Sequence, residues 1–280
     1  MLIIGRNEVE NVSDISVKNC NFNGVQKEPV KITGKTKNVK FDNLIINGSL
    51  VLNKEDRPYQ TYSEWLTHSE MQRTPHPYNL DFSPKKPRWS YVMGIEMEGM
   101  LDTYLYYKEK RDAANHDRIL EYLKEYPAKM IDEKGNITGY KYEDFNLDNV
   151  RTAKFILRMQ NFFPTKGNEL ALKTLFKQLQ NQPRTKEGVY WHKAIYANQV
   201  WLDGIFMGLP FYCNYAVQNL KPKKAKKILD DAVDQIIKTD YRTYDEKTQL
   251  WKHAWDETHQ QFWADKENGK SQHAPYETTY

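Results

Sequence analysis

Apolar side chains recur with two different periods along this chain of 280 residues. Residues 1–53 alternate between apolar and polar side chains, which is typical of strands that bury one face. From Arg88 onward the apolar side chains recur every three to four residues, which is the period of an α-helix. A polar stretch that ends at a proline, Asn53–Pro58, lies between them and is typical of a boundary. The pattern therefore predicts a short strand segment followed by a larger helical one.

The strand segment contains a repeat with a period of 24 residues, because Ile15–Gly24 is echoed by Val39–Gly48. A fixed period of this kind predicts one solenoid coil per repeat, with Asn in the turns because Asn tolerates the left-handed backbone. Two coils are too few to bury a continuous core. Residues 1–53 resemble the last coils of a right-handed β-helix of the polygalacturonase type, and we interpret them as a β-helix remnant. No catalytic aspartate of that family can be placed here, so the resemblance implies no activity.

Residues 54–61 are expected to be a linker, and residues 62–280 a mainly α-helical domain. Repeated helix–loop–helix units, with Trp, His and Gly in the loops, suggest a helical toroid. The last helix carries one apolar stripe, from Ile228 to Ile237. Asp148 and Asn168 stand at helix starts and are candidate caps. The predicted helices are Tyr62–Arg73, Ser90–Lys108, His116–Ile131, Asp148–Phe162, Gly167–Gln180, Asp203–Asn219 and Lys223–Thr239.

Composition excludes several classes of function. The 41 basic and 37 acidic residues are too balanced to indicate a nucleic-acid partner. The lysine-rich run 221–227 is interpreted as a solvated helix face. No run of about eighteen apolar residues is present, which predicts no membrane span, and the N-terminus lacks a secretory signal, so we expect a cytoplasmic protein unless the true start lies upstream. Cys20 and Cys213 form no disulfide or metal pattern, and each is expected to be a small buried residue.

Aromatic residues are abundant, with 19 Tyr, 11 Phe and 7 Trp. Five of the tryptophans lie between Trp191 and Trp263. Aromatic faces stack on the C–H faces of sugar rings, so this enrichment suits a carbohydrate site. A large aromatic core would explain it equally well, and composition alone does not separate the two.

The densest group of chemically useful residues runs from Gly188 to Phe211 and contains Asp203. This aspartate follows Trp201 and Leu202 and precedes a nearly all-apolar helix. A carboxylate in such surroundings loses hydration, which raises its pKa towards the range that a general acid needs. The helix dipole opposes that shift, and the competing interpretation of Asp203 is a helix N-cap.

Three further groups are weaker candidates. Asp148 also precedes a helix, and capping is its stronger generic interpretation. His253 and Glu257 are four residues apart and could bind a metal, but no third ligand stands at a regular spacing. Trp89 and Tyr91 are more typical of core residues. The chain has no Gly-x-Ser-x-Gly motif, no phosphate loop and no dinucleotide fingerprint.

Taken in order, these motifs resemble the unsaturated rhamnogalacturonyl hydrolases, glycoside hydrolase family 105, which share their fold with the unsaturated glucuronyl hydrolases of family 88. The resemblance spans about Tyr62 to His273. It rests on Trp-Ser-Tyr (89–91), Tyr-Trp-His-Lys (190–193), Gln-Val-Trp-Leu-Asp-Gly (199–204), Met-Gly-Leu-Pro-Phe (207–211), His-Ala-Trp-Asp-Glu (253–257) and Trp-Ala-Asp (263–265).

The resemblance implies an (α/α)6 barrel that hydrates the unsaturated uronic acid left on oligosaccharides by polysaccharide lyases. By resemblance, Asp203 is the acid and then the base, while Asp148 tunes Asp203 and stabilises the cationic transition state. Lys193 or His192 is expected to hold polar groups of the uronate, and Trp201 to stack on the sugar. His253 and, more weakly, Tyr91 match pocket residues. The family implies no metal and no organic cofactor.

The chain departs from the family pattern after His273, where further aromatic and helical segments are expected. Only about seven of the twelve barrel helices can be counted. We therefore expect an incomplete, C-terminally truncated barrel that exposes apolar helix faces. An oligomer or a complementing chain could cover those faces. The alternative function is an inactive helical module that binds carbohydrate or another protein.

Overall fold

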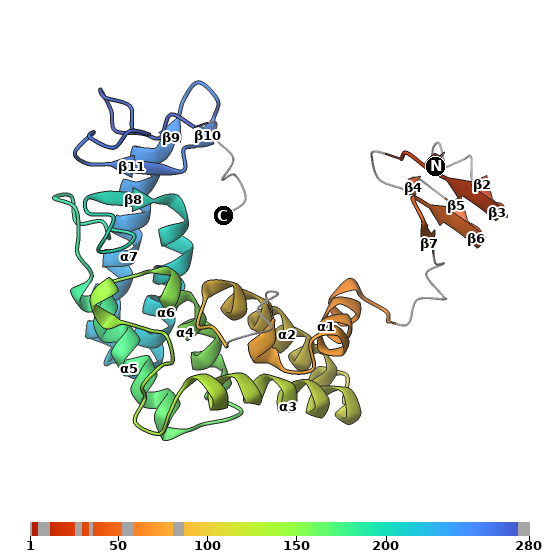
Figure 1. The fold of residues 1–280 in the computed structure, drawn as a ribbon, viewed down its shortest axis with the longest axis horizontal. Helices are drawn as coiled ribbons and strands as arrows, with labels where there is room; N and C mark the ends of the chain where they lie inside the picture. The colour runs from red at the N-terminus through yellow and green to blue at the C-terminus, as the bar shows by residue number, and fades with distance from the viewer. Residues whose placement is uncertain are drawn as a thin grey trace. The chain divides into compact units, whose positions relative to one another are not determined.

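The computed structural model describes residues 2–4, 12–25, 30–33, 36–51, 59–80 and 87–273. The chain forms two compact units, Met1–Leu66 and Thr67–Tyr280, and each is described by itself (Figure 1). Most of the predicted linker, residues 54–58, and the C-terminal residues 274–280 lie outside the described residues.

Parallel strand pairs build the first unit. Strand β3 (Ser16–Phe22) pairs with β6 (Lys40–Ile46), and the register places Ser16 opposite Lys40. Strand β2 (Val12–Ser13) pairs in parallel with β5 (Thr36–Lys37), and β1 (Leu2–Ile4) with β4 (Lys31–Thr33). The two copies of the sequence repeat therefore lie side by side, as successive coils would. A pectinase-type β-helix remains a prediction.

Asparagine side chains form a ladder between these two copies. Asn43 donates to Asn19 at 3.1 Å, and Asn38 donates to Asp14 at 2.8 Å. All four residues have positive φ, a backbone conformation that Asn and Asp tolerate, but Asn19 and Asn43 lie within strands β3 and β6 and not in the predicted turns. Strand β7 (Ser49–Val51) instead returns antiparallel to β6, which is a hairpin and not a coil.

The second unit is built mainly of helices, and each predicted helix is present within a few residues of its predicted ends. The seven α-helices of the described residues are α1 (Tyr62–Arg73), which begins in the first unit, α2 (Tyr91–Glu109), α3 (Ala113–Met130), α4 (Asp148–Met159), α5 (Lys166–Asn181), α6 (Leu202–Asn219) and α7 (Pro222–Thr243). The shorter elements are η1 (Pro77–Asn79), η2 (Tyr142–Asp144), β8 (Gln199–Trp201), β9 (Tyr244–Asp245), β10 (Leu250–Trp251) and β11 (Ala254–Asp256). Among the described residues, no helix is both long enough and apolar enough to cross a membrane.

The helices pack in a row of hairpins. Helix α2 packs on α3 and α4, α4 on α6, and α6 on α7 (Figure 1). Gly94 allows α2 to approach α4 closely, because a Cβ there would lie 2.6 Å from the Cα of Thr152. The buried core between the helices is rich in Leu, Tyr and Met. Trp89 belongs to it and stacks on Tyr126, which confirms its interpretation as a core residue.

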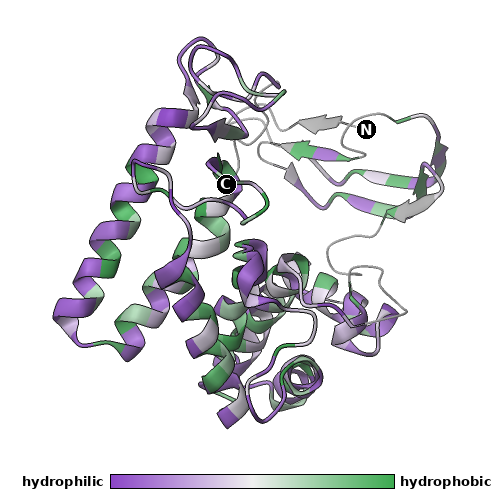
Figure 2. Cartoon of the chain, turned by 60° about the vertical axis from the view of Figure 1, so that its left-hand side comes forward, coloured by the Kyte–Doolittle hydropathy of each residue, from purple (hydrophilic) through white to green (hydrophobic). Residues whose placement is uncertain are grey.

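The apolar stripe predicted on α7 is largely exposed. Ala232 is buried, but Val233 and Ile237 expose 54% and 61% of their surface. Apolar and polar positions are both visible on the helices in Figure 2. The exposure agrees with the expectation that some helix faces are uncovered. The lysine-rich start of α7 is exposed, as predicted for a solvated face.

Two smaller predictions are wrong. Thr165, not Asn168, caps α5, because its side chain accepts the backbone N–H of Asn168. Both cysteines are free thiols as expected, but Cys20 and Cys213 are only half-buried. Cys20 lies on β3, and a unit with only two copies of the repeat is too small to cover this strand with a large core.

Candidate active site

The first turn of α4 carries Asp148, and a network of backbone contacts fixes its position. The backbone N–H of Leu147 donates to the carbonyl of His192 at 3.1 Å. The amide of Gln182 donates to the carbonyls of Phe145 and Trp191, at 2.6 and 2.9 Å. The segment that ends in His192 is therefore held against the start of α4. Asp148 is the first residue of α4 and not its cap: the N-cap position is Leu147, and the side chain of Asn146 accepts the backbone N–H of Asp148 at 3.0 Å.

Asp203 is placed by a strand that runs directly into a helix. Strand β8 pairs antiparallel with β11, and its last residue, Trp201, is the N-cap of α6. Asp203 is thus the second residue of the helix and does not occupy the N-cap position. The capping interpretation of Asp203 is wrong, because the β8–β11 pairing moves the cap to Trp201. Its Oδ1 is buried and has no hydrogen-bond partner among the described residues.

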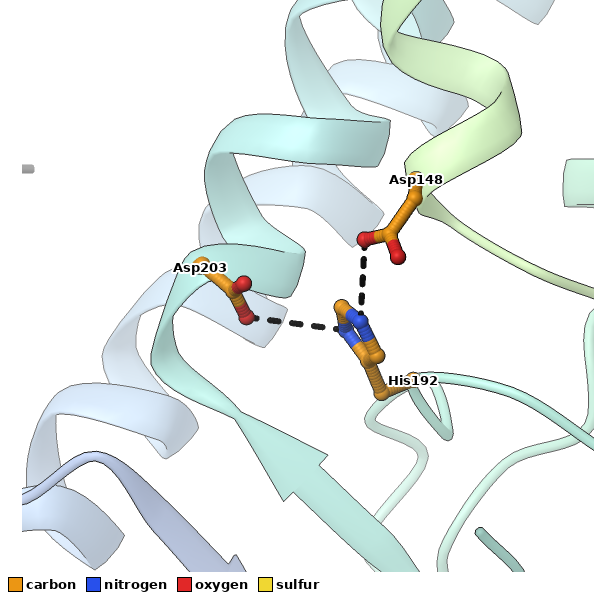
Figure 3. A group of neighbouring side chains, drawn as sticks. All are labelled: Asp148, His192 and Asp203. Atoms are coloured by element: carbon orange, nitrogen blue, oxygen red, sulfur yellow. Dashed lines mark ion pairs between the residues drawn. The ribbon is translucent and has the colours of Figure 1, made fainter. Parts of the chain in front are cut away.

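The ring of His192 lies between the two carboxyl groups (Figure 3). Its Nε2 is 3.0 Å from Oδ1 of Asp148, and its Nδ1 is 3.6 Å from Oδ1 of Asp203. The His192 side chain is 1% exposed, whereas Asp148 and Asp203 are 17% and 16% exposed. Gly204 makes room for the ring, because a Cβ there would lie 3.3 Å from Nδ1. Both aspartate side chains are therefore partly exposed to solvent, and the imidazole is enclosed.

The two aspartates have opposite pKa shifts. Burial raises the pKa of Asp203 most strongly, and the negative charge of Asp148 raises it further, whereas positive charge on Lys193, or on either neighbouring histidine when it is protonated, acts in the opposite direction. Burial also raises the pKa of Asp148, but the contacts with His192 and Lys193 outweigh burial and lower it overall. This arrangement favours a proton on Asp203 and a negative charge on Asp148, which is how an acid and an anionic partner differ.

Lys193 provides the positive charge nearest to Asp148. Its Nζ is 2.7 Å from Oδ2 of Asp148, and it also lies 5.5 Å from the ring centroid of Tyr196. The Lys193 side chain is 20% exposed. The sequence prediction did not include Tyr196, for which the only signal was its position three residues after Lys193.

Trp201 is the centre of an aromatic stack. Its ring lies parallel to His192 at 4.8 Å and to Tyr196 at 4.9 Å, and is tilted against His253 at 5.0 Å. Trp201 is therefore already stacked on two protein rings. His253 is brought to this stack by the β8–β11 pairing, since its carbonyl accepts the backbone N–H of Leu202 at 2.8 Å.

Tyr91 is placed apart from the other predicted site residues. It is the first residue of α2 and is 38% exposed. Among the described residues, no hydrogen bond, ion pair or ring contact joins Tyr91 to the cluster of Asp148, His192 and Asp203.

Donor atoms of Asp148, His192 and Asp203 lie within 4.8 Å of one another, a spacing that could hold a metal ion. The ammonium group of Lys193 already neutralises Asp148, and the raised pKa of Asp203 favours a neutral carboxyl group. Both features suit proton transfer better than cation binding.

The other candidate metal pair, His253 and Glu257, is not brought together into a cluster of three ligands in the described part of the chain. Glu257 accepts the backbone N–H of Lys186 at 2.8 Å. The neighbouring Asp256 is fully buried and accepts from the Thr258 hydroxyl and from three backbone N–H groups, those of Thr258, Gln260 and Gln261. These carboxylates shape the loops around β11.

A cavity of about 470 Å³ lies between α6 and α7, and its lining is mainly apolar. Leu202, Ile205 and Phe206 of α6 contribute to its wall, as does Ile236 of α7. Asp148 and Asp203 are not among its lining residues, so this cavity is not the space that the two carboxyl groups face.

Comparison with known proteins defines the class of this helical unit. The sequence profile of Glycosyl Hydrolase Family 88 matches residues 62–274. The structure of a glycoside hydrolase of family 105 from C. acetobutylicum ATCC 824 matches with 32% identity and a TM-score of 0.66, over 76% of this chain and 54% of that chain. A possible member of family 105 from Klebsiella pneumoniae subsp. pneumoniae MGH 78578 matches with 16% identity and a TM-score of 0.52, over 77% of this chain and 57% of that chain. The latter similarity concerns the fold alone.

The helical unit thus has part of the α/α toroid of these glycoside hydrolases. The chain belongs to glycosyl hydrolase family 88, within the family 88/105 group. It spans about half the length of the solved structures that it matches.

Proposed function

We propose that the chain hydrolyses oligosaccharides that end in an unsaturated galacturonyl or glucuronyl residue, such as those left by lyases acting on pectin or rhamnogalacturonan. The observation that carries the proposal is the pair Asp148 and Asp203. They sit at the starts of two adjacent helices, on either side of one imidazole, with opposite pKa shifts. The membership in family 88 supports the same chemistry.

In this reaction Asp203 gives its proton to C4 of the C4=C5 double bond. A C–H bond forms, the O–H bond breaks, and positive charge develops at C5 and the ring oxygen. The negative charge of Asp148 stabilises that cation. Water then adds at C5 and returns a proton to Asp203, and the resulting hemiketal opens and releases the rest of the oligosaccharide. One carboxyl group thus serves first as acid and then as base.

The surrounding residues would bind the sugar. We propose that Lys193 holds the uronate carboxylate, because its positively charged side chain is partly exposed, whereas His192 is enclosed. The aromatic stack of Trp201 would border the sugar, extended by Tyr196 and His253. Tyr91 would contact a more distant part of the substrate.

Two finer assignments belong to the same proposal. Residues 1–53 would be the end of a pectinase-type solenoid, which the parallel pairing of β3 with β6 supports. Residues 62–280 would be the hydrolase domain, in line with the matched residues 62–274.

The alternative is a module that binds carbohydrate or a partner chain without turnover, and the exposed apolar face of α7 favours it. The test is to mix the purified chain with lyase-treated rhamnogalacturonan and follow the ultraviolet absorbance of the conjugated uronate. Hydrolysis removes the double bond, so the absorbance falls with time. Sugar binding without any fall in absorbance would favour the module and contradict the hydrolase.

A further inference from the structure

In the candidate active site, two buried polar atoms lie close to each other without forming a hydrogen bond. These are Nδ1 of His192 and Oδ1 of Asp203, which lie 3.6 Å apart. Neither atom has a hydrogen-bond partner among the described residues. A buried polar atom without a partner costs free energy, so such atoms in a native structure call for an explanation. The separation exceeds a hydrogen bond by less than 1 Å, which a small side-chain movement can close.

The other side of the His192 ring is fully engaged. Its Nε2 lies 3.0 Å from Asp148, whose second oxygen lies 2.7 Å from Lys193. An ionised carboxylate can only accept hydrogen bonds, so the contact with Asp148 requires a proton on Nε2. Trp201 stacks on one face of the imidazole, and the space beside Gly204 fixes its edge.

Only two pairings make the contact between Nδ1 and Asp203 favourable. Either the neutral carboxyl group donates to the bare Nδ1, or a protonated Nδ1 donates to the carboxylate. Both pairings hold one proton between the same two atoms. The ionisable groups around the ring are Asp148 from α4 and Asp203 from α6, which contact it, Lys193, which contacts Asp148, and His253 from the loop before β11, which packs on Trp201.

We propose that His192 is a positioning residue that shares one proton with Asp203, so that the pair, and not Asp203 alone, stores the proton of the reaction. This inference rests on the proposed function and assigns His192 a role other than direct contact with the sugar. Rotation about the Cβ–Cγ bond of Asp203, which has a broad and two-fold torsional profile, turns the O–H group from His192 towards the substrate.

Over one reaction cycle, Asp203 loses one proton to the sugar and regains one from water. When Asp203 gives its proton to the sugar, the electron pair of the O–H bond stays on the carboxylate. That carboxylate faces the lone pair of Nδ1, which offers it no hydrogen bond. Its affinity for a proton is therefore high when the attacking water must lose one, and Asp203 recovers its proton from that water.

Two substitutions test the roles of the two ring nitrogens of His192 separately. In His192→Gln the side-chain amide can reach the place of Nε2 and keep the contact with Asp148, but the basic Nδ1 is lost. In His192→Asn the amide occupies the place of Nδ1 and cannot reach Asp148. The matched control is His76→Gln, an exposed histidine that pairs with Glu125 in a different part of the helical unit.

The pH profile of kcat/KM distinguishes a proton shared between His192 and Asp203 from a His192 that is always protonated and positively charged. If the pair stores the proton, His192→Gln moves the alkaline limb to lower pH by about one unit and lowers kcat. His76→Gln leaves both unchanged. A limb that moves to higher pH would show that a positive charge had been removed from beside Asp203. That result, or an unmoved limb, overturns the proposal.

A second measurement does not depend on turnover. In the wild-type chain with isotope-labelled histidine and aspartate, we expect the NMR signals of His192 Nδ1 and Asp203 Cγ to titrate with one common midpoint. The Nε2 signal should remain that of a protonated nitrogen throughout. Separate midpoints, or a proton on Nδ1 at every pH, would overturn the proposal. If the chain turns over substrate but the two midpoints differ, the shared proton is wrong and the proposed hydrolysis stands. If the midpoints agree but no substrate is turned over, the proposed hydrolysis is wrong.

Discussion

Asp148 and Asp203 contact opposite nitrogens of the same imidazole, yet the pKa values of their carboxyl groups move in opposite directions. The difference arises because Asp148 also contacts Lys193, while Oδ1 of Asp203 has no hydrogen-bond partner among the described residues. One aspartate is thereby kept as an anion and the other favours the neutral acid. The predictions below test how each neighbour contributes to that difference.

Replacing Lys193 with Met should raise the pKa of Asp148. Burial alone raises that pKa, and the contacts with His192 and Lys193 lower it. Without the ammonium group, Asp148 takes up a proton at higher pH as the solution is acidified. We expect the acidic limb of the kcat/KM profile to move to higher pH by about one unit.

Lys193→Met should also change how the stability of the folded chain depends on pH. Because the pKa of Asp148 is depressed in the folded chain, its stabilising contribution is present above its unfolded pKa and is lost as pH falls through its folded value. The difference in Tm between wild type and Lys193→Met should therefore shrink on acidification. The exposed Lys186, changed to Met, is the control. Equal effects of both substitutions would contradict the assigned contact.

Replacing Gly204 with Ala should disturb the His192 ring. The added Cβ would lie 3.3 Å from Nδ1 of His192 and 3.2 Å from Leu147, so one neighbour must shift by a few tenths of an ångström. We expect turnover to fall by about tenfold, because small displacements in an active site are costly. Stability should change little, since the helix propensity of Ala offsets the crowding.

Gly99 is the matched control, because it also lies within a helix and an added Cβ there meets no atom within 4 Å. Gly99→Ala should raise the free energy of unfolding by about 1 kcal/mol without changing turnover. Loss of turnover in this variant, or full turnover in Gly204→Ala, would be inconsistent with the site geometry.

Replacing Glu98 with Gln should destabilise the helical unit. The buried Glu98 of α2 contacts Arg151 at 2.6 Å, Lys154 at 2.9 Å and Arg158 at 3.1 Å, all from α4. Its loss leaves Arg151 charged and buried, at a cost of roughly 3 kcal/mol in unfolding free energy measured by denaturant titration. Glu169→Gln removes two exposed ion pairs, with Lys166 and Lys173, and should have a much smaller effect.

The effect of Glu98→Gln should also depend on pH. Burial raises the pKa of Glu98, but the contacts with Lys154 and Arg151 outweigh it and lower the pKa overall. The stabilising contribution is therefore present above the unfolded pKa and is lost as pH falls through the folded value. A destabilisation that persists unchanged in strong acid would argue for a packing defect and against the ion pair.

The positions of α3, α4, α5 and α7 could be predicted from the sequence because each of these helices carries a periodic apolar face. The N-cap positions of α4 and α6 could not be predicted in this way. A residue before an apolar run suggests a cap, but the cap position moved to Leu147 in α4 and to Trp201 in α6. In α6 the cause is the pairing of β8 with β11, which is a long-range contact that local pattern does not contain.

The exposed stripe of α7 marks a second limit. Its period predicts an apolar face, but the period does not say whether another element covers that face. Likewise, the residue types of Asp148, His192 and Asp203 suggested chemistry, while their proximity followed only from the family resemblance. The enclosure of His192 and the stacking of Tyr196 on Trp201 depend on side-chain packing and could not be predicted.

The most direct test of the account compares wild type with Asp203→Asn in the absorbance assay on lyase-treated rhamnogalacturonan. Asparagine keeps the size of the side chain but cannot donate the acid proton, so the rate of absorbance loss should fall by about a thousandfold while the fold is retained. If wild type consumes the unsaturated uronate and Asp203→Asn consumes it equally fast, Asp203 is not the acid and the account is contradicted.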